Sequence, residues 1–188
     1  MEKSDEMLVK ETKDGQLDSY DQLMQRHQQY VYRIAYSFAK SEQNAMDITQ
    51  NIFLKAYENI NRFREESQFK TWLTRISYNE GQNWTRKNKK HLMNEDIGNH
   101  VTKVISADTQ EDEYLALENK TLLLRSLYDL NTKYRLAIVL RYFENHSIRD
   151  IAEILNCSEG VVKNMLHRSL QKLKKNMTLT EFEAKHEK

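Results

Sequence analysis

The sequence contains no proline and only 4 glycines among its 188 residues. It therefore has little of the two residue types that most often interrupt helices. Glu, Lys, Gln, Leu and Ala, which favour helices, are frequent. We predict an all-α fold of two small helical domains joined by a flexible linker, with a helix-turn-helix at the end of the second domain.

The sequence also has a single cysteine and no long apolar run. One cysteine excludes an internal disulfide and cannot form a structural zinc site alone. No segment resembles a secretory signal or a membrane span. These absences predict a cytoplasmic protein with no direct membrane insertion. Cys157 itself lies in a predicted turn, where we expect a buried core thiol rather than a redox sensor.

Recognisable catalytic patterns are missing as well. The sequence has no glycine-rich loop for cradling phosphate, and none of its 6 histidines pairs with another at ligand spacing. The acidic residues and histidines form no recognisable catalytic set. We therefore predict a protein that is not an enzyme and that holds neither a cofactor nor a metal.

Net charge is nearly absent: charged residues make up 30% of the chain, but the formal net charge is only +1. A protein with this balance must concentrate its basic residues locally in order to bind nucleic acid. Two clusters do so: Arg86, Lys87, Lys89, Lys90 and His91 form the first, and Lys163, Arg168, Lys172, Lys174 and Lys175 form the second. For the first cluster, a solubilising charge run is the alternative interpretation.

Apolar residues recur at helical spacing in several segments. One helix is predicted to begin at Asp18 or Ser19, the next is capped by Ser41, and a third covers about residues 68–86. The resulting parts are a polar N-terminal tail (1–17), a three-helix domain (18–91), a linker (92–112), a second helical domain (113–177) and a polar C-terminal tail (178–188). The N-terminal tail is expected to be either frayed or a short helix.

The last third of the chain carries a helix-turn-helix pattern. Ile148–Leu155 is a short amphipathic helix, Asn156–Ser158 is a tight turn, and Glu159–Lys175 is a second helix. Ala152 falls where the two helices are expected to cross and where only a small side chain fits. Ser158 is expected to cap the second helix, whose free backbone N–H groups can bind a phosphate.

The second helix of this pattern has one apolar and one basic face. We expect the apolar residues at helical spacing to face the core; they are Val162, Leu166, Leu170 and Leu173. The polar residues then lie on the opposite, exposed face; they are Lys163, Asn164, His167 and Arg168. Such a face fits the major groove of DNA, where long polar side chains reach base edges and phosphates.

Four ordered segments resemble the extracytoplasmic-function (ECF) sigma factors, over a stretch from about Tyr20 to Lys175. Ala45–Phe53 is similar to the family pattern A-x-D-(L/I)-x-Q-x-x-F. Phe63–Asn79 is similar to F-x-x-x-S-x-F-x-T-W-L-x-R-I-A-x-N. Lys133–Phe143 resembles the K-Y-R…L-R-Y-F stretch, and Gly160–Arg168 resembles G-T-V-K-S-R-L-H-R.

The resemblance implies a protein that binds the RNA polymerase core, directs it to promoter DNA and helps to open the duplex. The first domain would dock on the core and read and melt the minus-ten element, and the second would read the minus-thirty-five element. The linker would thread through the core enzyme. Proteins of this family are usually held inactive by an anti-sigma factor, often membrane-bound, until an envelope or stress signal releases them.

The resemblance also assigns roles to individual residues. Binding to the polymerase core is implied for Asp47, Gln50, Asn51 and Phe53. Minus-ten recognition and melting is implied for Trp72, Arg75, Asn79, Arg86 and Lys87. Minus-thirty-five recognition is implied for Ser158, Lys163, Asn164, His167 and Arg168. Phe69 is expected in the core, and for Trp84 a core position and a DNA contact both stay open.

Several positions depart from the family pattern. Met165 stands where arginine is usual, which predicts a lost phosphate or packing contact and weaker promoter affinity. Asn131 stands where proline is frequent. Glu80 and Gly81 replace small apolar residues, and we expect the glycine to loosen its helix.

Three other interpretations stay open at this stage. A helix-turn-helix regulator would bind duplex DNA as a dimer, but neither a dimer interface nor an effector domain is recognisable. A helical adaptor without a DNA role would not depend on Lys163 or Arg168. A degenerate sigma-like protein would bind polymerase without reading promoters, which the change at Met165 would permit.

Overall fold

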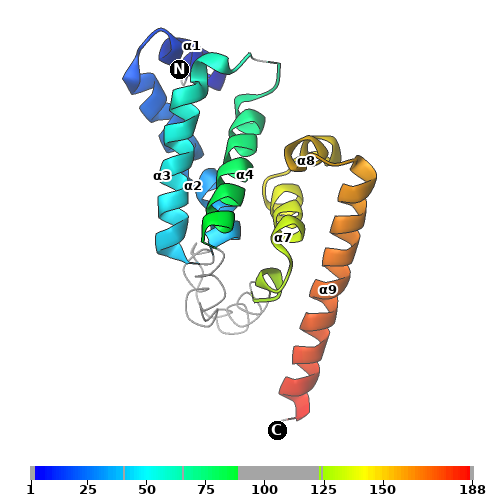
Figure 1. Cartoon of the computed structure of the whole chain (residues 1–188). Helices are drawn as coiled ribbons and strands as arrows, with labels where there is room; N and C mark the ends of the chain where they lie inside the picture. The colour runs from blue at the N-terminus through cyan, green and yellow to red at the C-terminus, as the bar shows by residue number, and fades with distance from the viewer. Residues whose placement is uncertain (1–2, 40, 65, 89–122, 124, 187–188) are drawn as a thin grey trace. The chain divides into compact units, whose positions relative to one another are not determined.

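The computed structural model describes residues 3–39, 41–64, 66–88, 123 and 125–186, with side chains described as far as residue 176 (Figure 1). Every regular element within these residues is helical, which confirms the predicted all-α fold. The chain divides into two compact units. The first contains the helices α1 to α4, and the second is built around α7 and α9. The predicted linker at 92–112 lies outside the described residues.

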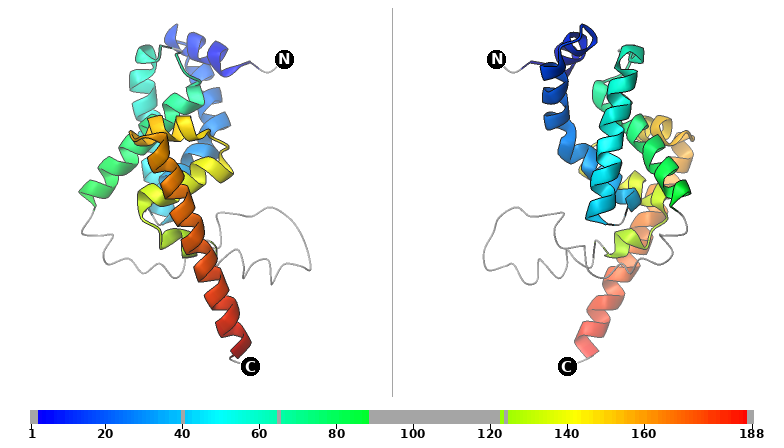
Figure 2. Two further views of the ribbon diagram at one scale, coloured as in Figure 1. Left: turned by 90° about the vertical axis from the view of Figure 1, so that its right-hand side faces the viewer. Right: turned by 60° about the vertical axis from the view of Figure 1, so that its left-hand side comes forward.

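Three long helices form the body of the first unit and lie side by side (Figures 1 and 2). They are α2 (Leu17–Ala39), α3 (Glu42–Asn59) and α4 (Phe69–Lys87). Their boundaries agree closely with the three helices predicted from the sequence. The predicted cap of α3 is confirmed, because the N–H of Asn44 donates to Ser41 Oγ at 3.4 Å. The fully buried side chains of this bundle include Leu23, Ile34, Ile48, Ile52 and Leu73.

A short 3₁₀ helix, η1 (Ile60–Arg62), follows α3 and leads to α4. Phe63 directly after η1 and Phe69 at the start of α4 are both buried. The two phenylalanine rings pack edge to face, with centroids 6.0 Å apart. They fix the path of the chain between the two helices.

The polar segment at residues 1–17, predicted to be either frayed or a short helix, contains a short helix. This helix is α1 (Asp5–Lys13), which packs on α2 and which Ser4 caps by accepting a hydrogen bond from the N–H of Met7. The side chains of Leu8 and Val9 are fully buried. Of the two alternatives for this segment, the structure shows the short helix, and the burial of Leu8 and Val9 holds it in place.

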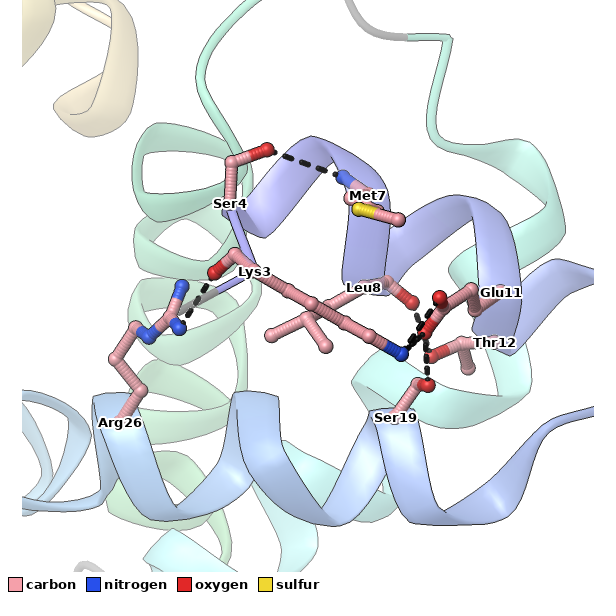
Figure 3. Close-up of polar contacts among 8 residues, drawn as sticks. All are labelled: Lys3, Ser4, Met7, Leu8, Glu11, Thr12, Ser19 and Arg26. Atoms are coloured by element: carbon pink, nitrogen blue, oxygen red, sulfur yellow. Dashed lines mark hydrogen bonds and ion pairs between the residues drawn. The ribbon is translucent and has the colours of Figure 1, made fainter. Parts of the chain in front are cut away.

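Polar contacts add to this packing of α1 (Figure 3). Lys3 Nζ pairs with Glu11 at 2.7 Å, and Ser19 Oγ of α2 donates to the same carboxylate at 2.5 Å. Arg26 of α2 donates to the carbonyl of Lys3 at 2.8 Å. Hydrogen bonds from Lys3 and Ser19 keep the pKa of the Glu11 carboxyl below its usual value. The N-terminal segment is therefore tied to α2 along its length.

The second unit is also helical in its described part. It contains α7 (Thr132–Ile138), a π-helical turn η3 (Val139–Phe143), α8 (Ile148–Leu155) and α9 (Glu159–His186). The fully buried side chains of this unit include Leu136, Leu140, Ile151, Leu155 and Val162. Asn131 caps α7 by accepting a hydrogen bond from the N–H of Lys133 at 3.1 Å. Asn131, which stands where the family often has proline, thus supplies a helix cap.

The last helix is longer than the sequence predicted. A polar tail was expected over 178–188, but α9 continues to His186 as one helix (Figure 2). The prediction was wrong because a polar composition does not by itself end a helix, and no proline or glycine follows Gly160.

Candidate functional site

The helix-turn-helix begins with a tightly capped first helix. Ser147 Oγ accepts a hydrogen bond from the N–H of Asp150 at 3.0 Å, and Asp150 accepts from the N–H of Ser147 at 3.1 Å. This reciprocal arrangement is a capping box. The hydrogen bonds from Ser147 hold the pKa of the Asp150 carboxyl below its usual value. The capped helix α8 spans the residues predicted for it.

The turn after α8 is set by a residue in the left-handed conformation. Asn156 has a φ of 50°, and its N–H donates to the carbonyl of Glu153 at 3.3 Å. The N–H of Cys157 donates to the carbonyl of Ala152 at 3.0 Å. This pair of bonds is a Schellman motif, for which asparagine is one of the favoured residues. The turn is therefore as tight as predicted, although Cys157 is partly exposed rather than buried in the core.

The second helix of the motif presents the predicted polar face. Ser158 caps α9, since its Oγ accepts a hydrogen bond from the N–H of Val161 at 3.4 Å. All four predicted DNA-facing side chains are exposed; they are Lys163, Asn164, His167 and Arg168. The buried side of the helix carries Val162, Met165, Leu166, Ser169 and Leu173. The polar and buried residues thus occupy opposite sides of α9.

Leu170 and Met165 lie on the two flanks of the buried stripe of α9. Leu170 was expected in the core but is 44% exposed, whereas Met165 is only 9% exposed. The buried stripe runs through Val162, Ser169 and Leu173 and passes between the two positions. Met165 therefore adds an apolar side chain to the core, and the effect of this departure on promoter affinity stays a prediction.

The predicted minus-ten residues lie on one side of α4. Trp72, Arg75, Asn79 and Arg86 follow one another at three, four and seven residues, which places them along the same stripe. Arg75, Asn79, Arg86 and Lys87 are exposed, and Trp72 is half-buried. Arg86 donates to Asn83 Oδ1 at 3.0 Å on the helix surface. The stripe combines one aromatic ring with an amide and two arginines, and Lys87 lies beside it.

Trp72 belongs to a cluster of three aromatic rings. Its ring centroid lies 5.1 Å from that of Phe63 and 5.7 Å from that of Phe69. Both phenylalanines are buried, as expected for Phe69, so the half-buried tryptophan forms the outer part of the cluster. Trp84 is also half-buried, and both of its predicted roles stay open.

The predicted polymerase-facing residues of α3 divide into two groups. Asp47, Gln50 and Asn51 are exposed and share one side of the helix. Phe53 is only 7% exposed, and its carbonyl accepts a hydrogen bond from the buried hydroxyl of Tyr20. Burial raises the pKa of the Tyr20 hydroxyl. The side chain of Phe53 therefore packs largely within the domain, and its role in binding the polymerase stays a prediction.

An apolar groove of about 530 Å³ runs between α2 and α3. Its lining comprises Leu17, Tyr20, Met24, Gln25, Gln28, Thr49, Gln50, Phe53, Leu54 and Tyr57. Leu54 and Tyr57 are 55% and 40% exposed, and the nearby Met46 is 50% exposed. Sequence reasoning missed this groove. The available signal was the set of apolar residues on the otherwise polar side of α3.

Both units match known families. Residues 23–91 match Sigma-70 region 2, and residues 120–173 match Sigma-70, region 4. The ECF RNA polymerase sigma-E factor of Haemophilus influenzae is 32% identical over 176 residues, covering 88% of this chain and 91% of that protein. The ECF RNA polymerase sigma factor SigW of Bacillus subtilis is 31% identical, covering 90% and 94%. The chain belongs to the ECF sigma factors.

Solved structures show the same fold for this sigma factor. The sigma factor RpoE of Bartonella quintana, in complex with the anti-sigma factor NepR, matches with a TM-score of 0.67 at 23% identity, covering 85% of this chain and 96% of that one. CnrH, in complex with the cytosolic domain of CnrY, also has a TM-score of 0.67, at 22% identity with 93% and 97% coverage. The two-domain helical prediction is thereby confirmed.

As a member of this family, the sigma factor binds the RNA polymerase core and directs it to promoters for transcription initiation. Among the residues that the structure describes, no helix is long and apolar enough to cross a membrane.

Proposed function

We propose that this sigma factor divides promoter recognition and polymerase binding among three surfaces, each on a different helix. The polar face of α9 reads the minus-thirty-five element, the stripe on α4 reads and melts the minus-ten element, and α3 docks on the core. One observation carries this proposal: the expected contact residues, except Phe53, lie on exposed or half-exposed sides opposite the buried cores.

The minus-thirty-five surface combines base readout with phosphate contacts. Asn164 and Arg168 have the donors and acceptors that pair with adenine and guanine edges in the major groove. Lys163 and His167 flank them on the exposed face. The helix start at Ser158 offers backbone N–H groups and the positive end of the helix dipole to a phosphate. The face therefore supplies both specificity and orientation.

The minus-ten surface suits an unpaired strand. Trp72 offers a partly exposed ring, and stacking of one base on an aromatic side chain contributes about 1–3 kcal/mol. Asn79 can pair with the edge of a flipped base through two hydrogen bonds. Arg75, Arg86 and Lys87 are exposed near them and can neutralise phosphates.

The polymerase-docking surface combines a polar row with an apolar groove. Asp47, Gln50 and Asn51 supply hydrogen-bonding groups on α3, and Gln50 also lines the groove beside Leu54. Exposed apolar patches rimmed by polar residues are typical of protein–protein interfaces. In this arrangement Phe53 and Tyr20 form the floor of the interface.

An anti-sigma factor is the expected negative regulator. The solved sigma factors similar to this chain are held in complexes with anti-sigma factors. An anti-sigma factor that covers the groove would block docking on the polymerase, and an envelope or stress signal would release it. The sigma factor would act in the cytoplasm and perform no catalysis itself, since the polymerase carries out the chemistry.

In vitro transcription with purified core polymerase on a genomic DNA library tests the proposal. Adding the full-length chain should produce discrete new start sites that share upstream elements. A stable complex with core but no transcript would instead favour the degenerate sigma-like protein. Neither a complex nor a transcript would favour a DNA-binding regulator.

Variants at each surface separate its role. Asn79→Ala should spare core binding but impair open-complex formation, whereas Asp47→Ala should weaken core binding itself. Gln29→Ala, at an exposed amide of α2, is the control for Asn79→Ala. Glu6→Ala, at an exposed acid of α1, is the control for Asp47→Ala. An Asn79→Ala protein that no longer binds core would show that this residue belongs to a different surface.

A further inference from the structure

Helix α1 precedes the segment that matches Sigma-70 region 2, which begins at residue 23 within α2. It nevertheless reaches the aromatic cluster of Phe63, Phe69 and Trp72. Contacts join α1 to this cluster at both ends of the helix. None of the roles assigned above involves α1, so these contacts call for an explanation.

Lys13 at the end of α1 holds Phe63 from two directions. Its Nζ donates to the carbonyl of Phe63 at 2.8 Å and lies 5.6 Å from the centroid of the Phe63 ring. The first contact is a charge-assisted hydrogen bond, and the second is within cation–π range. Phe63 follows η1 directly, so its carbonyl lies where the chain turns toward α4. One side chain of α1 thus fixes both the backbone and the ring of Phe63.

Asp5 at the start of α1 reaches the same cluster through His27. Its Oδ2 lies 2.7 Å from His27 Nε2, and its Oδ1 pairs with Arg26 at 2.5 Å. The ring of His27, a buried residue of α2, packs on Phe69 with centroids 5.4 Å apart. Helix α1 therefore braces both phenylalanines on which Trp72 packs.

We propose that Lys13 is a positioning residue for minus-ten readout: it holds Phe63 so that Trp72 presents a preformed stacking surface to the unpaired base. This inference rests on the proposed role of Trp72. Fixing a binding surface before the ligand arrives removes part of the ordering cost from the binding step. Loss of Lys13 should therefore weaken capture of the melted strand, although Lys13 itself touches no DNA.

The test measures binding of a labelled single strand by the holoenzyme assembled from core and the full-length chain. The strand carries the non-template minus-ten sequence of a promoter found by the transcription experiment, and a scrambled strand of equal length is the reference. The variants are Lys13→Met, Lys13→Arg and Asp5→Asn. Lys10→Met is the matched control, because Lys10 is an exposed lysine on the same helix.

We expect Lys13→Met to weaken binding of the minus-ten strand by about tenfold, the scale of one lost charge-assisted hydrogen bond. Affinities for the scrambled strand and for core should match those of Lys10→Met. Lys13→Arg should restore most of the affinity, since it keeps the charge and the donor. Asp5→Asn should act in the same direction, which covers the case that Lys13→Met folds poorly.

Three results would overturn the proposal. Equal losses for Lys13→Met and Lys10→Met would indicate a general charge effect. A loss that follows core affinity would indicate a purely structural role. Wild-type affinity in both Lys13→Met and Asp5→Asn would remove α1 from minus-ten binding. A Trp72→Ala holoenzyme that binds the minus-ten strand with wild-type affinity would also refute the role of Trp72. If Trp72→Ala weakens binding of this strand but Lys13→Met and Asp5→Asn do not, only the inference about Lys13 is refuted.

Discussion

Gly81 of α4 lies directly against the ring of Phe38 of α2. A Cβ atom at Gly81 would lie 2.6 Å from Phe38 Cγ, closer than such atoms approach in proteins. Both residues are buried, and α4 continues through Gly81 without interruption. The glycine was expected to loosen the helix, but its effect is to let the two helices approach closely.

Gly81→Ala should lower the free energy of unfolding by up to about 2 kcal/mol, because overpacking costs about 1–3 kcal/mol and the gain that alanine gives a helix, about 1 kcal/mol, offsets only part of it. Urea unfolding followed by circular dichroism measures the change. The double variant with Phe38→Leu should recover part of the loss. Gly160→Ala is the control, since the nearest atom to its Cβ would lie 3.9 Å away. A stabilised Gly81→Ala protein would contradict the close contact.

Met165→Ala should destabilise the second unit by about 2–4 kcal/mol, because it leaves a cavity in the core. Affinity for the minus-thirty-five duplex should stay within about twofold of wild type at a temperature where both proteins are folded, a change of less than about 0.5 kcal/mol. Thermal unfolding and duplex binding of the holoenzyme measure the two effects. Lys163→Ala should show the reverse pattern, with lower affinity and unchanged stability. A stable Met165→Ala protein with poor DNA binding would place Met165 on the DNA face.

Asp150→Ala should destabilise the second unit by about 1 kcal/mol at pH 7, the usual cost of a lost helix cap. The pKa of Asp150 is lowered in the folded state, so its stabilising effect is present above the unfolded pKa of about 3.9 and is lost as the pH falls through the folded value. The difference between wild type and variant should therefore close in acid. Unfolding curves at pH 7 and below pH 4 test this. If the double variant loses as much stability as Ser147→Ala and Asp150→Ala together, the two residues do not share a capping box.

Arg168→Ala should weaken minus-thirty-five binding by about 1–3 kcal/mol and relax specificity at one base pair, if Arg168 reads a base. If it contacts only phosphate, the loss should be similar for every sequence and the salt dependence should fall. Titration of the holoenzyme with matched and mutated duplexes at several salt concentrations separates the two cases. Lys10→Ala, at an exposed cation of α1 in the first unit, is the control. An unchanged transcript level with Arg168→Ala would remove this residue from the site.

Features that depend on local sequence were predicted well. The ends of α8 and the cap at Ser41 follow from residues within a few positions of each helix start or end. The exposed polar side of α9 follows from the period of its apolar residues. In each case the physical cause lies within one or two turns of the helix.

Features that depend on contacts between distant segments were not predicted. Leu8 and Val9 show no helical period, and their burial comes from packing of α1 on α2. Gly81 looks like a weak point until Phe38 is placed beside it. Phe53 fits the family pattern of a surface helix, yet it packs beneath the groove between α2 and α3. Such relationships arise only when the helices are assembled.

Helix α1 also changes where the first domain can be cut from the chain. A fragment that started at the family boundary, residue 23, would begin inside α2 and would lack α1 altogether. The α2 surface that α1 covers would then face solvent. An expression fragment of this domain has to begin before Ser4, whose hydroxyl caps the first helix. The segment that matches Sigma-70 region 2 and the folding unit of this domain therefore start at different residues.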